Sequence, residues 1–533
     1  MPSSPPSPAH SPATADPARG GILSTMVVEE AEPPDLSVST GRTVAIITCI
    51  TSITGIGNLL GGLLTVSIPV IAADLHIPPE LQLWPAAAFA LACGCTLLPC
   101  GAIADVLGCR RACLLGGLFQ AASALGAGLA TTSTQLIALR GAAGLAASFC
   151  LPGAVGVAAH AFPITNSPRR RSAAFAAMGG GQAVGFGLGL ALGGVFSDTV
   201  GWRWGFYTTA LLNGAVLALA LWALPPGGIG GGGVDDGPLG QAGLTRLARD
   251  VDWVGALLSS ASLALLSYVL ALATGSDAER SMREPLHLVL LCAALALLPA
   301  FGLWTRRQTR LGRPALIPTT LWANVPFTAI CVTVFLVWGA LNASEQLTAL
   351  YLQDVRGVSS LTASLYFMPA PVCGALMNAA IGVLLPYLRP SLAVPVGCFV
   401  SGVAPLLLAT LCHVDGPGYW RGVFQAMALN PLGADLIYTI ANLVVTAAFP
   451  TRTQALAGGV FNMLAQIGKS VGIATSAVIA RQVTAQVNEV GTKEALLRGY
   501  KAAWWYNCSL GFASVAVSFW GLRSVTKLGA KRE

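Results

Sequence analysis

The stretch Gly101-Ala-Ile-Ala-Asp105-Val-Leu-Gly108-Cys-Arg110-Arg111 separates two long apolar runs and holds the first basic residues after Arg42. Glycine permits a tight bend and a close approach of backbones. Basic residues in a short loop between two membrane spans mark the cytoplasmic side of the membrane. The stretch therefore predicts a short cytoplasmic loop between two transmembrane helices.

The composition extends this interpretation to the whole chain. Of the 533 residues, 54% are hydrophobic and only 10% are charged, and the mean hydropathy is +0.68. Soluble domains carry about 25% charged residues, so the sequence predicts an all-α polytopic membrane protein. The net charge of +7 then reflects Lys and Arg in cytoplasmic loops and not a nucleic-acid partner.

Several kinds of chemistry have no support in the sequence. Most of the 13 cysteines lie inside apolar runs, where cysteine acts as a small hydrophobic residue. No pair of CxxC motifs indicates zinc, and no GxxxxGK[ST] motif indicates ATP-driven pumping. We therefore expect no enzyme activity, no metal and no cofactor, with a proton gradient as the energy source.

Fourteen apolar runs are long enough to cross a bilayer. Residues 1–42 are predicted to be a disordered cytoplasmic tail, and no cleaved signal peptide is expected. A glycine-rich cytoplasmic linker at 225–251 separates an N-terminal half (43–224) from two extra spans (252–315) and a C-terminal half (316–523), with a tail at 524–533. The predicted spans are 45–73, 81–103, 112–131, 135–161, 172–196, 203–224, 252–273, 285–305, 324–353, 359–387, 391–411, 419–448, 453–482 and 500–522.

The opening stretch resembles the signature loop of the major facilitator superfamily. The resemblance implies a conformational latch formed by Gly101, Asp105, Gly108, Arg110 and Arg111. A weak repeat supports two homologous six-helix halves, because Gly382-Val-Leu-Leu-Pro386-Tyr-Leu-Arg389 can be aligned with that loop. Paired repeats with a site between them at mid-membrane are the usual plan of secondary transporters.

Glycines recur every four residues in the fifth predicted span. Small residues at this spacing allow helix backbones to approach closely. The end of the run resembles the antiporter signature of the superfamily, with Leu190 at the position of the signature proline. Generic helix packing is the alternative interpretation. The glycines are Gly181, Gly185, Gly189, Gly193 and Gly194.

Ionisable residues inside membrane spans are functional candidates by default. Asp435, Glu345, Arg140 and Lys469 are the candidates for proton coupling, and Arg140 also resembles the arginine of the superfamily's fourth span. Interfacial snorkelling of Arg140 and contact of Glu345 with headgroup water are the alternatives. From the helical rise we place Asp435 and Lys469 about one turn apart in depth, and we predict that they form a breakable pair.

Neutral polar residues in the spans are candidates for lining a central cavity, or only for bonds between helices. These residues are Asn58, Gln182, Asn442, Asn462 and Gln466.

With its extra central pair, the chain resembles the fungal fourteen-span drug:proton antiporters. Trp202-Arg-Trp204, Tyr351-Leu-Gln353 and Asn462-Met-Leu-Ala-Gln466 also fit that group. The resemblance implies proton-coupled efflux of drugs, toxins or secondary metabolites by a monomer in the plasma membrane or the vacuolar membrane. Its partners would be protons, the lipid bilayer and a small-molecule substrate.

Three alternatives stay open at this point. They are proton-coupled uptake of a nutrient, a transport-dead membrane sensor, and a membrane enzyme. Leu190 at the proline position keeps uptake open, whereas the short predicted tails disfavour a sensor.

The charge bias generates a test of topology. The loops on the side of Arg110 hold nearly twice as many Lys and Arg residues as the loops on the other side, which predicts an even number of spans with both termini in the cytosol. Tags on both ends should resist external protease in intact cells and be cut after permeabilisation. Cleavage of one tag in intact cells would mean an odd number of spans.

Overall fold

The computed structural model describes residues 40–162, 168–224, 251–274, 284–384, 389–415, 418–449, 451–487, 493–523 and 525. The predicted N-terminal tail and nearly all of the 225–251 linker lie outside these ranges. The described chain is helical, without strands, as the sequence predicted.

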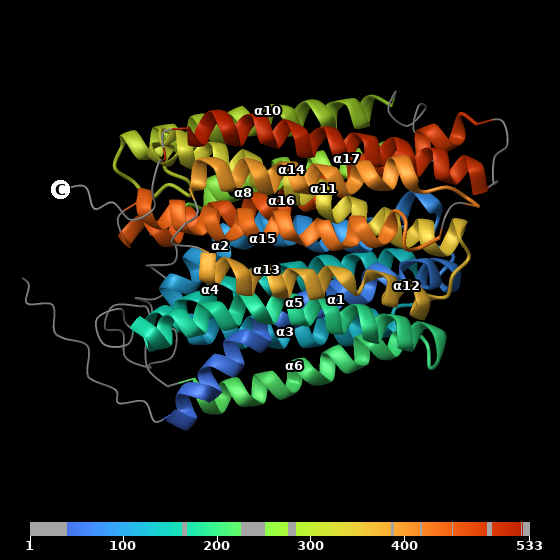
Figure 1. Ribbon diagram of the computed structural model, residues 1–533. Coiled ribbons are helices and arrows are strands. Elements are labelled where there is room, and N and C mark those ends of the chain that lie inside the picture. Colours follow the sequence, from blue (N-terminus) through green and yellow to red (C-terminus); the bar gives the residue numbers. More distant parts are fainter. Residues whose placement is uncertain are drawn as a thin grey trace, which may run out of the picture. The chain divides into compact units, whose positions relative to one another are not determined.

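The helices follow the chain in the order of the predicted spans (Figure 1). They are α1 (Thr40–Asp74), α2 (Trp84–Leu107), α3 (Cys109–Leu129), α4 (Ser133–Ala161), α5 (Pro168–Asp198), α6 (Arg203–Ala223), α8 (Trp253–Thr274), α10 (Pro285–Arg310), α11 (Val325–Leu350), α12 (Ser360–Phe367), α13 (Pro369–Leu384), α14 (Pro390–Leu411), α15 (Val423–Ala448), α16 (Thr451–Ala485) and α17 (Lys493–Leu522).

Each predicted span corresponds to helix, with α12 and α13 together forming the tenth. Among the described residues, 11 helical segments are long and apolar enough to cross a membrane, and one of them, Ser360–Ile381, combines α12 with most of α13. The tenth span was predicted as one run, but it breaks at Met368, where Pro369 begins the next helix. Proline lacks the N–H that a continuous helix needs, so the break follows from the sequence. The end of α11 continues as one π-helical turn, Tyr351–Val355.

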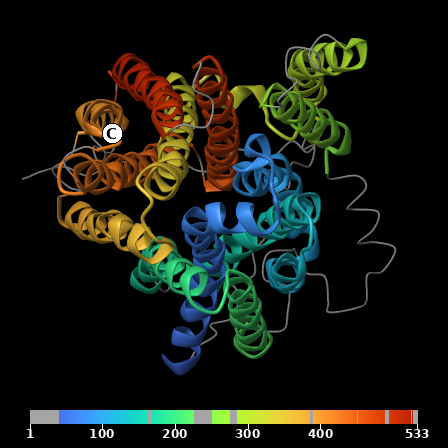
Figure 2. The same ribbon diagram turned by 90° about the vertical axis from the view of Figure 1, so that its right-hand side faces the viewer.

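Helices α1–α6 form the N-terminal half, and α11–α17 form the C-terminal half. Figure 2 looks along the helices and shows them side by side. The extra pair α8 and α10 packs together, and α8 also contacts α2 of one half and α16 of the other. Ser260 of α8 donates a hydrogen bond to the Cys95 carbonyl at 2.9 Å. The extra pair therefore covers the junction between the halves on the side of α2 and α16.

The glycine stripe of α5 packs against α1. A Cβ on Gly185 or Gly189 would overlap the carbonyl oxygen of Gly55 or Leu59, and a Cβ on Gly193 would lie 2.7 Å from the Leu63 carbonyl oxygen. Contacts four residues apart on both helices indicate that the two backbones touch over several turns, as small residues allow. In the structure the stripe is a helix-packing surface.

Gly194 lies on a different face of α5. A Cβ there would come within 2.7 Å of the Ser364 Cβ on α12. The α5 helix therefore uses glycine both within its own half and against the other half. Leu190, at the position of the signature proline, is fully buried.

These contacts predict that one methyl group added to a glycine of the stripe lowers the stability of the protein. Gly189→Ala should destabilise the protein, because the added Cβ must displace the α1 backbone at Leu59, and overpacking of this kind costs roughly 1–3 kcal/mol. Gly180→Ala on the same helix is the matched control, since a Cβ there meets nothing within 4 Å. Thermal unfolding of both variants in detergent measures the difference. Equal melting temperatures would contradict close packing of α1 on α5.

Candidate functional site: a buried charge cluster

Arg140 of α4 is buried inside the protein. Only 2% of it is exposed. Its Nε donates to the Pro85 carbonyl of α2 at 3.2 Å, and its guanidinium lies 4.7 Å from the centre of the Phe89 ring. Nη1 is buried without a hydrogen-bond partner. The Arg140 side chain is therefore held among protein groups, and it keeps donor capacity for another group.

Glu345 of α11 is also buried, with 8% of its surface exposed. Its Oε1 accepts a hydrogen bond from Asn430 Nδ2 of α15 at 3.1 Å, and Asn430 itself is 1% exposed. This side chain therefore points into the protein and not toward headgroup water. A carboxyl group held in this way inside a membrane protein can bind and release a proton.

Lys469 of α16 lies near the two. Its charge lies within electrostatic range of Glu345 and of Arg140, and among the described residues it makes no ion pair within 4.0 Å with either group. The position of Lys469 follows from Gly468, because a Cβ on that glycine would overlap the Phe335 carbonyl oxygen of α11. Close packing of α16 on α11 thereby brings Lys469 toward the helix that carries Glu345. Arg140, Lys469 and Glu345 form what we call the charge cluster, with two cations and one carboxylate.

Asp435 does not pair with Lys469, and that prediction is wrong. Asp435 faces α13, where a Cβ on Gly374 would lie 3.1 Å from its Oδ2. Asn378 of α13, whose amide donates to the Gly374 carbonyl at 3.0 Å, lies close to the Asp435 carboxyl group. The side chain is half-buried. The depth estimate was not enough, because α15 turns Asp435 toward α13 whereas α16 packs mainly on α11.

The two halves touch at the end predicted to be extracellular. Gln346 Nε2 of α11 donates to Thr65 Oγ1 of α1 at 2.8 Å. Gln353 Nε2 donates to the Val66 carbonyl, also at 2.8 Å. Both bonds join α1 of the N-terminal half to the C-terminal half.

Two further contacts complete this junction. Asp198, at the end of α5, accepts from the backbone N–H groups of Ser360 and Leu361 at 3.2 and 2.9 Å, which is the favourable place for a carboxylate at a helix N-terminus. Ser470 of α16 donates to the Ala87 carbonyl of α2 at 3.1 Å. We call these cross-half hydrogen bonds the outer seal.

The loop at Gly101–Arg111 sits at the other end of the N-terminal half. Gly108 has a φ of +93°, which favours glycine at this turn. Asp105 is exposed in the last turn of α2 and interacts electrostatically with His160 of α4. Arg110 Nη2 donates to the Leu221 carbonyl of α6 at 3.3 Å. The latch residues thus bind other helices of their own half, and Arg111 is exposed.

The neutral polar candidates have local partners. Asn58 donates to the Thr54 carbonyl at 3.1 Å, and Asn462 donates to the Gly458 carbonyl at 2.9 Å. Gln182 and Gln466 are half-buried in mid-helix. The Asn442 side chain lies outside the described part of the structure. A role of these residues in lining a cavity stays a prediction.

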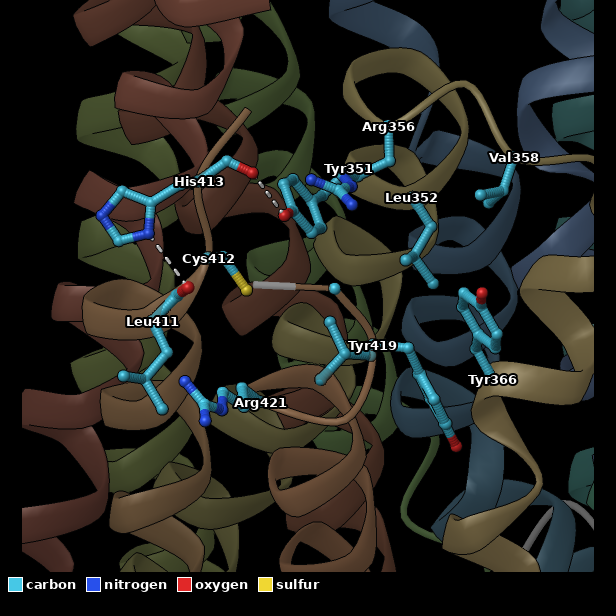
Figure 3. Close-up of a pocket in the computed structure, with 12 residues that line it drawn as sticks. Tyr351, Leu352, Arg356, Val358, Tyr366, Leu411, Cys412, His413, Tyr419 and Arg421 are labelled. Carbon is cyan, nitrogen blue, oxygen red and sulfur yellow. Dashed lines mark hydrogen bonds between the residues drawn. The ribbon is translucent and has the colours of Figure 1, made fainter. Parts of the chain in front are cut away.

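A separate pocket of about 100 Å³ opens at the outer end of the C-terminal half. Figure 3 shows Tyr366 and Tyr419 together on one side, with their rings stacked 4.0 Å apart. Tyr351 donates to the His413 carbonyl at 2.9 Å, and Arg356 donates to the Val414 carbonyl at 2.7 Å. None of the predicted site residues lines this pocket.

Sequence reasoning missed Asn430 and the residues of the outer seal. A signal for Asn430 existed, because it precedes Pro431 within an apolar span. Gln346 directly follows Glu345, and Ser470 directly follows Lys469. Nothing in the sequence shows that these neighbours bond across the halves.

Comparison with known proteins agrees with the family that the sequence motifs resemble. Residues 47–473 match the family model described as Major Facilitator Superfamily. The chain is similar to "MFS-type transporter 1" of Pyricularia oryzae, with 37% identity over 92% of this chain and 85% of that protein. It is 24% identical to "Efflux pump terJ" of Aspergillus terreus over 83% of this chain and 81% of the relative.

Other similar proteins are named for the transport of ammonium or peptides. The "Low affinity ammonium transporter" of Saccharomyces cerevisiae is 23% identical over 82% of this chain and 79% of its own length. Among solved structures, a peptide transporter POT in complex with sulfate superimposes with a TM-score of 0.63 at 14% identity. That match covers 91% of this chain and 96% of the other, and it shows the fold alone.

The environment of Arg140 generates a prediction. Arg140→Lys should lower both stability and transport, because an ammonium group cannot keep the bond to Pro85 together with the planar contact on Phe89. The lost bond to a charged group corresponds to about 1.5–3 kcal/mol. Arg203→Lys, which changes a half-exposed arginine over Trp202, serves as the control. Thermal unfolding and transport of both variants should be measured, and an Arg140→Lys protein as stable and active as the control would contradict the assignment.

Proposed function

Because the chain belongs to the Major Facilitator Superfamily, we propose that it is a secondary active transporter that exports small organic compounds in exchange for protons by alternating access. The observation that supports proton coupling is the pair of carboxylic acids inside the spans of the C-terminal half. Glu345 is held by Asn430, and Asp435 lies against Asn378. Both can change charge inside the membrane without metal or nucleotide.

Exchange requires that a proton and the cargo exclude each other. A carboxyl group meets this condition, since it can either hold a proton or, when ionised, interact with the cargo. Asp435 is half-buried and Asn378 beside it is exposed, so neither side chain is enclosed in the protein core. We assign competition between proton and cargo to Asp435, and proton binding to Glu345.

Support for export comes from the relatives. One of them is named an efflux pump, and the resemblance to fourteen-span antiporters points the same way. Drugs, toxins or secondary metabolites are the cargo that this proposal implies, and the plasma membrane is the expected location.

Proton-coupled uptake is the second candidate. Two observations favour it. Leu190 replaces the signature proline of the antiporters, and another relative is named an ammonium transporter. Direction is therefore the decisive measurement.

The test uses a fungal strain without the protein, complemented with the wild type, Asp435→Asn or Glu345→Gln. A panel of toxic organic compounds is supplied, and intracellular accumulation is measured with and without a protonophore. The wild type should lower the accumulation of at least one compound, a protonophore should reverse this, and both variants should fail to lower it.

Asp415→Asn is the control, because it removes a carboxylate in an exposed outer loop. It should transport like the wild type at equal expression. Higher accumulation in wild-type cells than in cells without the protein would establish uptake. Full activity of Asp435→Asn and Glu345→Gln would contradict coupling through these groups.

A further inference from the structure

The pocket at the outer end of the C-terminal half is built by three segments of the chain (Figure 3). The π-helical turn and the residue after it contribute Tyr351 and Arg356, α12 contributes Tyr366, and the loop between α14 and α15 contributes Tyr419 and Arg421. None of the proton-coupling candidates lines it. The proposed function therefore leaves this pocket without a role.

Hydrogen bonds hold the walls of the pocket in place. Tyr351 and Arg356 donate to the carbonyl groups of His413 and Val414, at 2.9 and 2.7 Å. These bonds tie the loop between α14 and α15 to the π-helical turn. Gly422 ends that loop with a φ of +129°, which favours glycine. The pocket is therefore formed before any ligand arrives, which lowers the entropy cost of binding.

Two arginines give the pocket a positive charge. Figure 3 shows Arg356 above and Arg421 below Cys412. Arg421 is exposed, and no hydrogen bond or ion pair joins it to the residues that the structure describes. Val423, the first residue of α15, also lines the pocket, and the N-terminus of a helix carries a partial positive charge.

No carboxylate is among the residues that line the pocket. Asp354 of the π-helical turn instead lies against Tyr500 of α17, with 3.5 Å between its Oδ2 and the tyrosine hydroxyl. Asp415, in the loop between α14 and α15, is exposed and does not line the pocket. The positive charge is thus not neutralised by the walls, and the pocket is suited to an anion.

The size and the walls of the pocket favour a small aromatic molecule. Its volume of about 100 Å³ is below the roughly 300–1,000 Å³ of sites for drug-sized ligands, and a cavity of about 150 Å³ can hold benzene. Tyr366 and Tyr419 stack with their ring centres 4.0 Å apart. Aromatic rings attract a further ring to their faces and edges.

We propose that this pocket binds a small aromatic carboxylic acid that arrives from the outer side of the membrane. Its carboxylate lies between Arg421 and Arg356, and its ring lies against Tyr351 and Tyr419. An arginine and a carboxylate form strong charge-assisted hydrogen bonds. Arg356 can take part while it keeps its bond to Val414, because a guanidinium group has five N–H donors.

This inference goes beyond the proposed function and does not depend on it. The halves touch at the outer end in this structure, where Gln353 donates to the Val66 carbonyl. The pocket is open in the same state, and Leu352 and Arg356 line it on either side of Gln353 in the chain. An acid from outside can therefore bind before any transport step.

Binding of radiolabelled benzoate to the purified full chain in phosphatidylcholine nanodiscs tests the proposal. Benzoate should bind, whereas benzylamine, which has the opposite charge, and inorganic phosphate, which has no ring, should not displace it at the same concentration. Photolabelling with 4-azidobenzoate should modify peptides within 351–366 or 411–423, and excess benzoate should prevent the modification.

Arg421→Gln should weaken benzoate binding on the order of tenfold, because a charge-assisted hydrogen bond is lost. Arg498→Gln is the matched control. It removes an exposed arginine near the start of α17, at the same end of the protein, that does not line the pocket. This control should bind benzoate like the wild type. Thermal unfolding of both variants checks that they fold, and photolabelling of the wild type tests the site without any substitution.

Several results would overturn the proposal. They are equal benzoate binding by Arg421→Gln and Arg498→Gln, and photolabelling confined to other segments. Loss of binding in Asp435→Asn but not in Arg421→Gln would place benzoate in the proposed cargo site. Displacement of benzoate by inorganic phosphate, or by phosphatidylglycerol in the nanodisc, would assign the pocket to a phosphate headgroup. Benzoate binding that depends on Arg421, in a protein that moves no compound in the accumulation assay, would retain this inference and reject the proposed function.

Discussion

The structure depends on one constraint, which is the cost of placing charge where the membrane provides no water. A single cation at the centre of a span costs roughly 2.5–3.5 kcal/mol. Arg140 and Lys469 are two such cations, and the carboxylate of Glu345 lies close enough to Lys469 to interact with it. The backbone of α2 and the ring of Phe89 accommodate Arg140. The proposed proton-coupled transport would use charged groups placed at this cost.

Glycine contacts make this arrangement possible. Gly468 and Gly472 bring α16 against α11 near Gly339, and Gly185 and Gly189 bring α5 against α1. Because the backbones nearly touch, the polar side chains beside these contacts reach their neighbours without long gaps. Helix packing by small residues and the placement of charge are therefore parts of the same arrangement. The glycines position the residues on which function depends.

The two ends of the bundle differ in how their halves meet. At the outer end, described hydrogen bonds cross from Thr65, Val66, Ala87 and Asp198 to the C-terminal half. At the other end, Asp105 and Arg110 interact within the N-terminal half. The cited hydrogen bonds between the halves thus lie on the side predicted to be extracellular, whereas apolar packing of α2 on α16 continues toward the other end, at Leu98 and Gly459.

The sequence by itself determined the class of protein, the order of its long apolar helices and the charged residues inside them. These follow from hydropathy, helical rise and a few motifs, all of which are local.

The sequence could not determine which of the charged side chains lie close to one another. Asp435 and Lys469 lie on consecutive helices at similar depth, yet Lys469 interacts with Glu345, more than 120 residues earlier in the chain. Depth is fixed by position along a helix, whereas the partner depends on how each helix is rotated and which helix it packs against. The contact of Gly468 with α11 decides this for Lys469, and the contact of α15 with α13 decides it for Asp435. Only the tertiary structure contains that information, because it arises from packing between segments far apart in sequence.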